Sequence, residues 1–307
     1  MKKILYISFL LSIVIMACKK EITAEAPTVD FTVRNAKSTI GDTLVFKLGD
    51  TCKFDVSGYA DNIAHWSGIV GNNYDNRNRT SALGKLILTF STTMQFGTQA
   101  NTFKVLAIKN LASLDSATVV NANWTDITSR TTLATSATAV STGNVDVTDL
   151  VSSADDVLYL AFKYSGVTGS TQRTWVISNY SLTNIGSDFS YVLSNLANDA
   201  SYWTRYGNVW TPTSARWTAT SSALTIVGGA ATLPTNTSWI ITKPLYVGRI
   251  TQDIPTATVK NLASAAVTYY EYKYAAVGTY KSTFAYFSNT KDNTNAGSKN
   301  FYIKITQ

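Results

Sequence analysis

Short runs of alternating apolar and polar residues, separated by turns, recur along most of the chain. Residues 30–35 (DFTVRN), 43–48 (TLVFKL) and 52–58 (CKFDVSG) place apolar side chains at every second position. This spacing puts the apolar side chains on one face of an extended chain, whereas an amphipathic helix needs a period near 3.6. The pattern therefore predicts half-buried β-strands in the first part of the chain.

The same rhythm continues to the C-terminus. Further strand-like runs lie at 83–95, 103–110, 117–128, 145–166, 173–183 and 268–307. Thr, Ser, Val, Tyr and Asn dominate the composition, and these residues favour strands and turns over helices. Many short strands with frequent turns are typical of a β-sandwich, so the sequence predicts an all-β protein.

The N-terminus departs from this pattern. Lys2 and Lys3 precede an apolar run over residues 4–16, which is too short to span a bilayer and has the form of a secretory signal. An ordinary secretory signal or an N-terminal anchor helix is the alternative. Residues 15–18 (IMAC) resemble a bacterial lipobox, which implies that the signal peptide covers residues 1–18 and that Cys18 carries lipid.

The resemblance also places the protein in the cell envelope. Residues 19–21 (KKE) resemble the short charged signals that send lipoproteins to the cell surface, and residues 19–27 read as a polar tether. We expect an outer-membrane protein facing the cell exterior, bound to the membrane through its lipid anchor only. Cys52 then has no partner for a disulfide and is expected to be a buried apolar residue.

Charge and chemistry narrow the classes of function. Only 15% of the 307 residues are charged, and the net charge of +7 is scattered without a basic stripe, which argues against nucleic-acid binding. His65 is the only histidine, and most aspartates stand singly in turns, with the adjacent Asp155 and Asp156 read as a solvated turn. Neither a catalytic triad nor a facing carboxylate pair is therefore indicated. We expect no enzyme, no metal and no cofactor, and we expect Trp66 to be a core residue.

The order of the strand-like phrases indicates two domains. Residues 41–68 resemble the first half of a polycystic-kidney-disease-type (PKD) immunoglobulin-like sandwich, and residues 268–307 resemble its closing strands. Residues 145–183 resemble a jelly-roll module of the galactose-binding or carbohydrate-binding kind. This implies a discontinuous PKD-like domain over 28–79 and 243–307, with a jelly roll inserted at 80–242. Three consecutive domains are the alternative.

Taken whole, the phrases, including residues 217–247 with SWIITKPL, resemble an uncharacterised family of surface lipoproteins, the domain of unknown function 5017 type. Its members are encoded near SusD-like glycan-uptake proteins. The resemblance implies a non-catalytic lipoprotein that binds a polysaccharide or oligosaccharide for a SusC/SusD-like uptake complex. A structural or adhesive envelope protein that binds another protein is the alternative.

One aromatic stretch, residues 199–222, offers candidate ligand contacts. Side chains alternate along a strand, so residues seven apart face opposite ways and the three tryptophans cannot form one flat shelf. Trp217 is expected inside the sandwich. An aromatic ring at a sandwich rim can stack on a sugar while polar neighbours bind hydroxyls. The candidate carbohydrate-binding residues are Trp203, Arg205, Tyr206 and Trp210.

Overall fold

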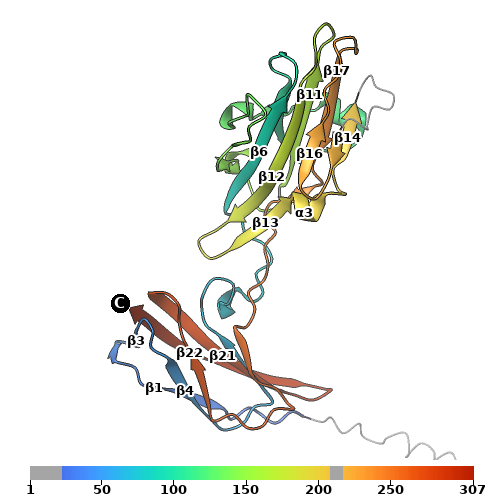
Figure 1. The fold of residues 1–307 in the computed structure, drawn as a ribbon. Coiled ribbons are helices and arrows are strands. Elements are labelled where there is room, and N and C mark those ends of the chain that lie inside the picture. The colour runs from blue at the N-terminus through green and yellow to red at the C-terminus, as the bar shows by residue number, and fades with distance from the viewer. Residues whose placement is uncertain (1–22, 208–216) are drawn as a thin grey trace, which may run out of the picture. The chain divides into compact units, whose positions relative to one another are not determined.

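A computed structural model describes residues 23–207 and 217–307. The described chain consists mainly of β-strands arranged in several sheets (Figure 1), which confirms the all-β sandwich fold. It forms two compact units. The first combines residues up to Arg77 with Asp253–Gln307, and the second is Asn78–Gln252. Among the described residues, every helix falls short of the length and apolar character needed to cross a membrane.

The first unit is a sandwich of two sheets whose strands come from both ends of the chain. The smaller sheet has the order β1-β4-β20, and the larger has the order β19-β5-β21-β22-β3-β2. All pairs are antiparallel except β22 and β3. The strands are β1 (Asp30–Arg34), β2 (Ser38–Ile40), β3 (Thr43–Lys47), β4 (Cys52–Ser57), β5 (Asn62–Trp66), β19 (Ala257–Lys260), β20 (Tyr269–Tyr272), β21 (Gly278–Asn289) and β22 (Thr294–Thr306).

Aromatic rings fill the space between these two sheets. Phe284 of β21 stacks on Phe31 of β1 with ring centroids 4.4 Å apart, and it meets Phe54 of β4 edge-on at 4.9 Å. Cys52 is fully buried in this core, as expected, and burial raises the pKa of its thiol to about 12. The thiol therefore stays protonated and acts as a small apolar side chain.

His65, rather than Trp66, points into the core of this sandwich. In the β5–β21 register His65 lies opposite the core residue Phe284, so alternation sends Trp66 to the outer face. There Trp66 is buried against Tyr74 of the short helix η1 (Tyr74–Asn76), with ring centroids 5.5 Å apart. Trp66 is thus buried, but the expectation that it belongs to the sandwich core is wrong.

Part of the expected tether at residues 19–27 is fixed to the first unit. The backbone N–H of Ala24 donates to Asn293 Oδ1 at 2.5 Å, and Asn295 Nδ2 donates to the Ala24 carbonyl at 2.7 Å. Ala24 is buried as a result. Ala24 is therefore part of the packed first unit.

The second unit is a sandwich of two larger sheets. One has the order β10-β6-β12-β16-β15, with β13 on β12 and β9 on β6; the other has the order β14-β17-β11-β7-β8, with β18 on β11. The strands are β6 (Lys85–Gln95), β7 (Phe103–Lys109), β8 (Thr125–Asp126), β9 (Val140–Ser141), β10 (Val145–Asp146), β11 (Val157–Gly166), β12 (Thr174–Ile185), β13 (Ser190–Asn195), β14 (Thr204–Gly207), β15 (Trp217–Ala219), β16 (Ala223–Ile226), β17 (Asn236–Ile241) and β18 (Leu245–Tyr246).

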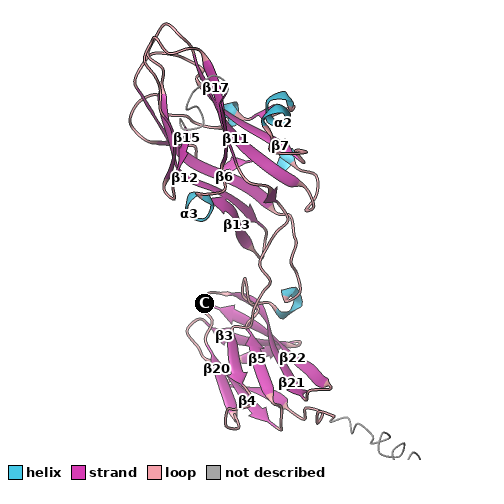
Figure 2. Ribbon diagram, turned by 90° about the vertical axis from the view of Figure 1, so that its right-hand side faces the viewer, coloured by secondary structure: helices cyan, strands magenta, loops and turns pink. Residues whose placement is uncertain are grey.

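Four short helices lie at the margins of these sheets. Figure 2 shows α2 near β7 and α3 beside β13. Phe90 of one sheet meets Phe162 of the other edge-on at 5.4 Å, so the main core lies between the sheets. The helices are α2 (Ser116–Asn121), η2 (Thr128–Arg130), η3 (Thr148–Leu150) and α3 (Leu196–Asp199).

The second unit extends beyond the segment 80–242 that the sequence suggests. Residues 245–246 form β18, which pairs with the start of β11, and they therefore belong to this unit. At the other boundary, Arg79 forms an ion pair with Asp188 at 2.9 Å. The second unit therefore begins at Asn78 and ends at Gln252, outside both expected boundaries.

The burial of His65 predicts a pH-dependent stability. His65 is fully buried among aromatic rings, and burial lowers its pKa from 6.5 to about 3. Between these values the unfolded chain binds the proton and the folded chain does not, so stability falls as pH decreases below 6.5. From about pH 7.5 to about pH 5 we expect a loss of roughly 2 kcal/mol, measured by urea unfolding.

The matched control is His65→Gln, which removes the titrating ring and keeps a polar group near Ser282, whose Oγ lies 2.9 Å from His65 Nε2. We expect this variant to lose much less stability over the same range. Equal pH dependence of the two proteins would contradict a neutral, buried His65.

Candidate functional site

The residues that the sequence proposes for ligand binding are divided between two faces of β14. Tyr206 pairs with Trp239 of β17 and lies on the outer face of the sheet, while Arg205 pairs with the core residue Ile240. Period-two alternation places Trp203 on the same inner side as Arg205. Trp210 lies outside the described residues.

Trp203 is a core residue. It exposes only 6% of its surface, and its ring lies 5.1 Å from that of Tyr180 and 6.2 Å from that of Phe162. Both faces of the indole are therefore unavailable to a sugar. The expectation that Trp203 stacks on a ligand is wrong, because the strand that follows it turns its ring inward. Trp217 is also buried, as expected, and begins a strand of the other sheet.

Arg205 is exposed, but its guanidinium has a structural contact. Its Nη1 donates to the carbonyl oxygen of Trp217 at 3.2 Å. Trp217 lies in β15 of one sheet and Arg205 in β14 of the other. The bond therefore links the two sheets at an open margin of the sandwich, which gives Arg205 a role without any ligand.

Tyr206 lines a groove on the outer face of the sheet. The groove has a volume of about 240 Å³ and lies between β11, β14, β17 and α2. Trp239 also lines this groove, and its ring already has two neighbours. The Lys163 ammonium lies 4.6 Å from the centroid of the Trp239 ring, and the centroid of the Trp124 ring lies 5.7 Å from it. Trp239 exposes only 4% of its surface, so Tyr206 is the half-buried ring that this groove presents.

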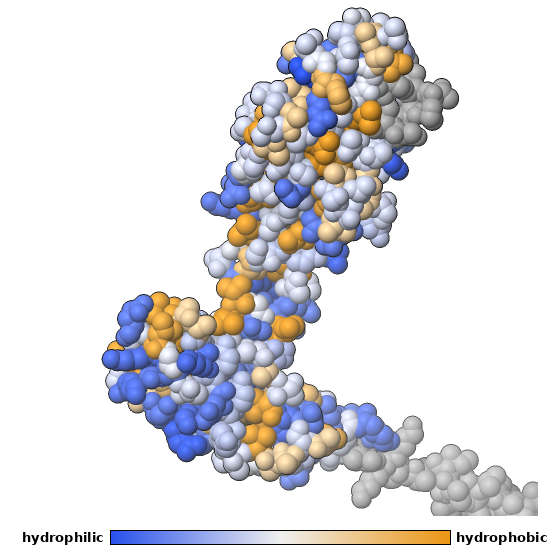
Figure 3. Space-filling model, viewed as in Figure 1, coloured by the Kyte–Doolittle hydropathy of each residue, from blue (hydrophilic) through white to orange (hydrophobic). Residues whose placement is uncertain are grey.

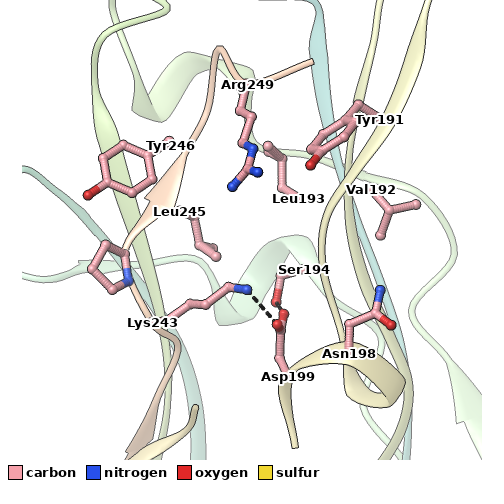
Figure 4. A pocket seen from close by; sticks show the side chains of 11 residues that line it. Tyr191, Val192, Leu193, Ser194, Asn198, Asp199, Lys243, Leu245, Tyr246 and Arg249 are labelled. Atoms are coloured by element: carbon pink, nitrogen blue, oxygen red, sulfur yellow. Dashed lines mark hydrogen bonds and ion pairs between the residues drawn. The ribbon is translucent and has the colours of Figure 1, made fainter. Parts of the chain in front are cut away.

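A second cavity of this unit is lined by aromatic and charged side chains, some of them exposed. It has a volume of about 140 Å³, and we call it the tyrosine pocket. One wall is the β13–α3 segment with Tyr191, and the other is the returning chain at 243–249 with Tyr246. Figure 4 shows Arg249 between these two tyrosines, with Lys243 and Asp199 at the opposite end of the pocket. Tyr246 is 59% exposed, so its ring is available for stacking.

Asp199 fixes the base of the tyrosine pocket. Its carboxylate accepts hydrogen bonds from Ser194 Oγ at 2.6 Å and from the backbone N–H of Asn195 at 3.2 Å. It also forms an ion pair with Lys243 Nζ at 2.5 Å, and its own side chain is only 4% exposed. The ion pair joins the two walls, and it places the Lys243 ammonium 5.3 Å from the exposed ring of Tyr202.

Local sequence explains this arrangement. Asn195 caps α3 by accepting a hydrogen bond from the Asn198 backbone at 2.8 Å, so the helix starts where β13 ends. One short turn then places Asp199 back beside Ser194. Because α3 is a single turn, its geometry depends on these side-chain bonds rather than on helix propensity.

The arginine in the pocket differs from the others that the structure describes. The guanidinium groups of the other described arginines make ion pairs, hydrogen bonds to carbonyls or a stacking contact. Arg249 is exposed, and its guanidinium makes no such contact with the residues that the structure describes. The engaged arginines are Arg34, Arg77, Arg79, Arg130, Arg173 and Arg205.

Among the described residues that line the tyrosine pocket, Asp199 is the single carboxylate, and it is held by Lys243. Glycoside hydrolysis most often uses two carboxylates that flank the scissile bond. In the described ranges, no group of three or more His, Cys, Asp or Glu side chains is placed to hold a metal ion.

Sequence reasoning missed this pocket for an identifiable reason. Lys243 lies in the motif SWIITKPL, but the motif indicates fold rather than function. Tyr191 and Tyr246 stand far apart in the sequence, each in an ordinary strand-like run. The only signal is Arg249, a charged residue directly after a glycine that follows β18.

Comparison with known proteins gives one result. Residues 17–202 match the model of a domain of unknown function, DUF5017. The match includes the β13–α3 wall of the tyrosine pocket and ends before the opposite wall at 243–249. No curated protein and no solved structure shows a significant match to the chain.

The burial of Trp203 predicts a structural rather than a functional phenotype. Trp203→Ala is expected to reduce the free energy of unfolding of the second unit by about 3–5 kcal/mol, because it leaves a cavity beside Phe162 and Tyr180. Tyr206→Ala, at a half-buried position, should cost about 1 kcal/mol or less. Urea unfolding followed by tryptophan fluorescence measures both. A Trp203→Ala loss no larger than the Tyr206→Ala loss would show that Trp203 is not a core residue.

Proposed function

The chain belongs to the DUF5017 family, and we propose that this protein is a non-catalytic, glycan-binding lipoprotein whose binding site is the tyrosine pocket. The observation that carries the proposal is the pairing of an exposed tyrosine ring with hydrogen-bonding groups in one cavity. Tyr246 and Tyr191 supply aromatic surface, and Arg249, Lys243 and Asn198 supply polar groups around it. Aromatic stacking and converging polar groups are the chemistry by which a protein binds a sugar ring.

The visible surface of the molecule agrees with a polar ligand. On the faces that Figure 3 shows, apolar residues form separate spots among polar ones. Large contiguous apolar patches are typical of protein–protein interfaces, whereas scattered apolar residues are normal for any surface. The resemblance of residues 145–183 to carbohydrate-binding jelly rolls supports the same function by analogy of fold.

The proposal includes a lipid anchor. The basic residues, the apolar run and Cys18 at the N-terminus have the order of a lipoprotein signal, and Cys18 lies outside the described residues. A lipid-anchored protein on the outer membrane facing the cell exterior would hold a polysaccharide where a SusC/SusD-like uptake complex can receive it. Several acyl chains on one cysteine would anchor the protein stably.

Substitutions in the pocket test the site. We expect the chain without residues 1–18 to be retarded by at least one polymer in affinity electrophoresis against plant, host and microbial polysaccharides. Tyr246→Ala and Tyr191→Ala should each weaken binding about tenfold, because stacking of one ring contributes roughly 1–2 kcal/mol. Tyr206→Ala is the matched control, since it removes a tyrosine from the groove on the outer face of β14 and β17 in the same unit.

Each other outcome has a definite meaning. Loss of binding in Tyr206→Ala alone would move the site to the groove on the outer face of β14 and β17. Absence of retardation by every polymer would overturn glycan binding and favour an envelope protein that binds another protein.

Substitution of Cys18 tests the anchor. Cys18→Ala removes the only cysteine that the lipobox resemblance assigns to acylation, so incorporation of labelled fatty acid should fall to background. The protein should also leave the membrane fraction of the cell. Cys52→Ala is the control and should keep both properties. Labelling of Cys18→Ala equal to that of the unsubstituted protein would exclude this anchor.

A further inference from the structure

We infer that the tyrosine pocket selects an acidic saccharide, one whose sugar carries a carboxylate or a sulfate ester, and that Arg249 binds this acidic group. The inference rests on the proposed function and adds the ligand class to it. Asp199 and Lys243 form an ion pair and cancel each other, so Arg249 supplies the net charge of one positive unit.

Arg249 is held at the pocket by its backbone. Its own N–H donates to the Tyr246 carbonyl at 3.0 Å, and Gly248 N–H donates to the Ala154 carbonyl at 3.1 Å. A Cβ on Gly248 would come within 2.4 Å of that same carbonyl oxygen, so glycine is needed for the close approach. On the other side, Ile250 N–H donates to the Thr80 carbonyl at 3.3 Å. The backbone on both sides of Arg249 is therefore fixed while its side chain stays exposed.

The chemistry of the guanidinium identifies the ligand class. A planar guanidinium donates two parallel hydrogen bonds to a carboxylate or sulfate, and such charge-assisted bonds are about twice as strong as neutral ones. Within the described ranges, no carboxylate forms an ion pair with Arg249, although the other pocket cation, Lys243, has Asp199. Figure 4 shows the Arg249 side chain between Tyr246 and Tyr191, pointing into the pocket.

A neutral sugar would make fewer interactions in this pocket than an acidic one. Stacking on Tyr246 and hydroxyl contacts with Asn198 are available to any sugar, but the guanidinium would keep only hydroxyl or water partners. An acidic sugar makes the same contacts and adds the charge-assisted pair. Selectivity therefore comes from Arg249, and affinity for sugar rings in general comes from the tyrosines.

The experiment compares polymers that differ only in charge. The probes are polygalacturonate against its methyl ester, for a carboxylate, and a sulfated galactan against its desulfated form, for a sulfate. Binding to the chain without residues 1–18 is measured by affinity electrophoresis and by titration calorimetry. We expect at least one acidic polymer to bind about tenfold or more tightly than its neutral partner. The polymer pair in which the acidic member binds more tightly shows whether Arg249 binds a carboxylate or a sulfate.

Substitutions assign that preference to the pocket. Arg249→Gln should weaken binding of the acidic polymer about tenfold or more and leave binding of the neutral partner unchanged, while Arg249→Lys should recover part of the loss. Lys85→Gln is the matched control, because Lys85 is an exposed cation of the same unit outside the pocket. Thermal unfolding confirms that each variant folds.

The outcomes separate this inference from the proposed function. Equal binding of acidic and neutral polymers, lost in Tyr246→Ala, would overturn the acidic class and keep glycan binding. Equal losses in Arg249→Gln and Lys85→Gln would reveal general charge attraction and overturn the role of Arg249. Absence of binding to all four polymers and to the wider polysaccharide panel would overturn both proposals.

Discussion

The pairing of β5 with β21 is the constraint on which the rest of the structure depends. β5 belongs to the N-terminal part of the chain and β21 to the C-terminal part, and their register places His65 opposite Phe284 in the aromatic core. The first sandwich therefore needs both ends of the chain. The second unit must in turn begin and end near one place, so that its exit segment can return to the first. That exit segment runs as β18 beside β11 and on through Arg249, and it forms one wall of the tyrosine pocket.

The tyrosine pocket is thus a consequence of the chain path as much as of local sequence. The β13–α3 wall is made within the body of the second unit, and the Lys243–Asp199 ion pair joins it to the exit segment. The DUF5017 match reaches residue 202 and so includes the first wall only. Variation in the exit segment would change the charge and aromatic character of the pocket without changing the sandwich.

The sequence predicts the class of fold because alternation is a local property. It predicts strands and buried residues such as Cys52 and Trp217, which the structure confirms. The face of the sheet on which a side chain lies is harder to predict from sequence. In NIAHWSG (residues 62–68) either His65 or Trp66 could point inward, and only the pairing with β21 decides which does. The ligand contacts predicted in residues 199–222 are not brought together for the same reason. Trp203 and Tyr206 lie on opposite faces of the sheet. The pocket itself joins residues from distant segments, and no local pattern marks such a meeting.

The return of the chain also bears on the order of folding. β22 lies against β3, where Thr306 donates to the Phe46 carbonyl across 260 positions of sequence, and contacts of such separation slow folding because a long loop must close first. The second unit shortens that loop. Its ends are joined by a bridge between Ser81 and Arg249, and the Ala82 N–H donates to the Gly248 carbonyl at 2.8 Å. Once this unit has folded, the two halves of the first sandwich are separated by short connections only, and the entropy cost of bringing them together falls accordingly. The inserted unit thus acts as an intramolecular clamp that turns a distant encounter into a nearly local one.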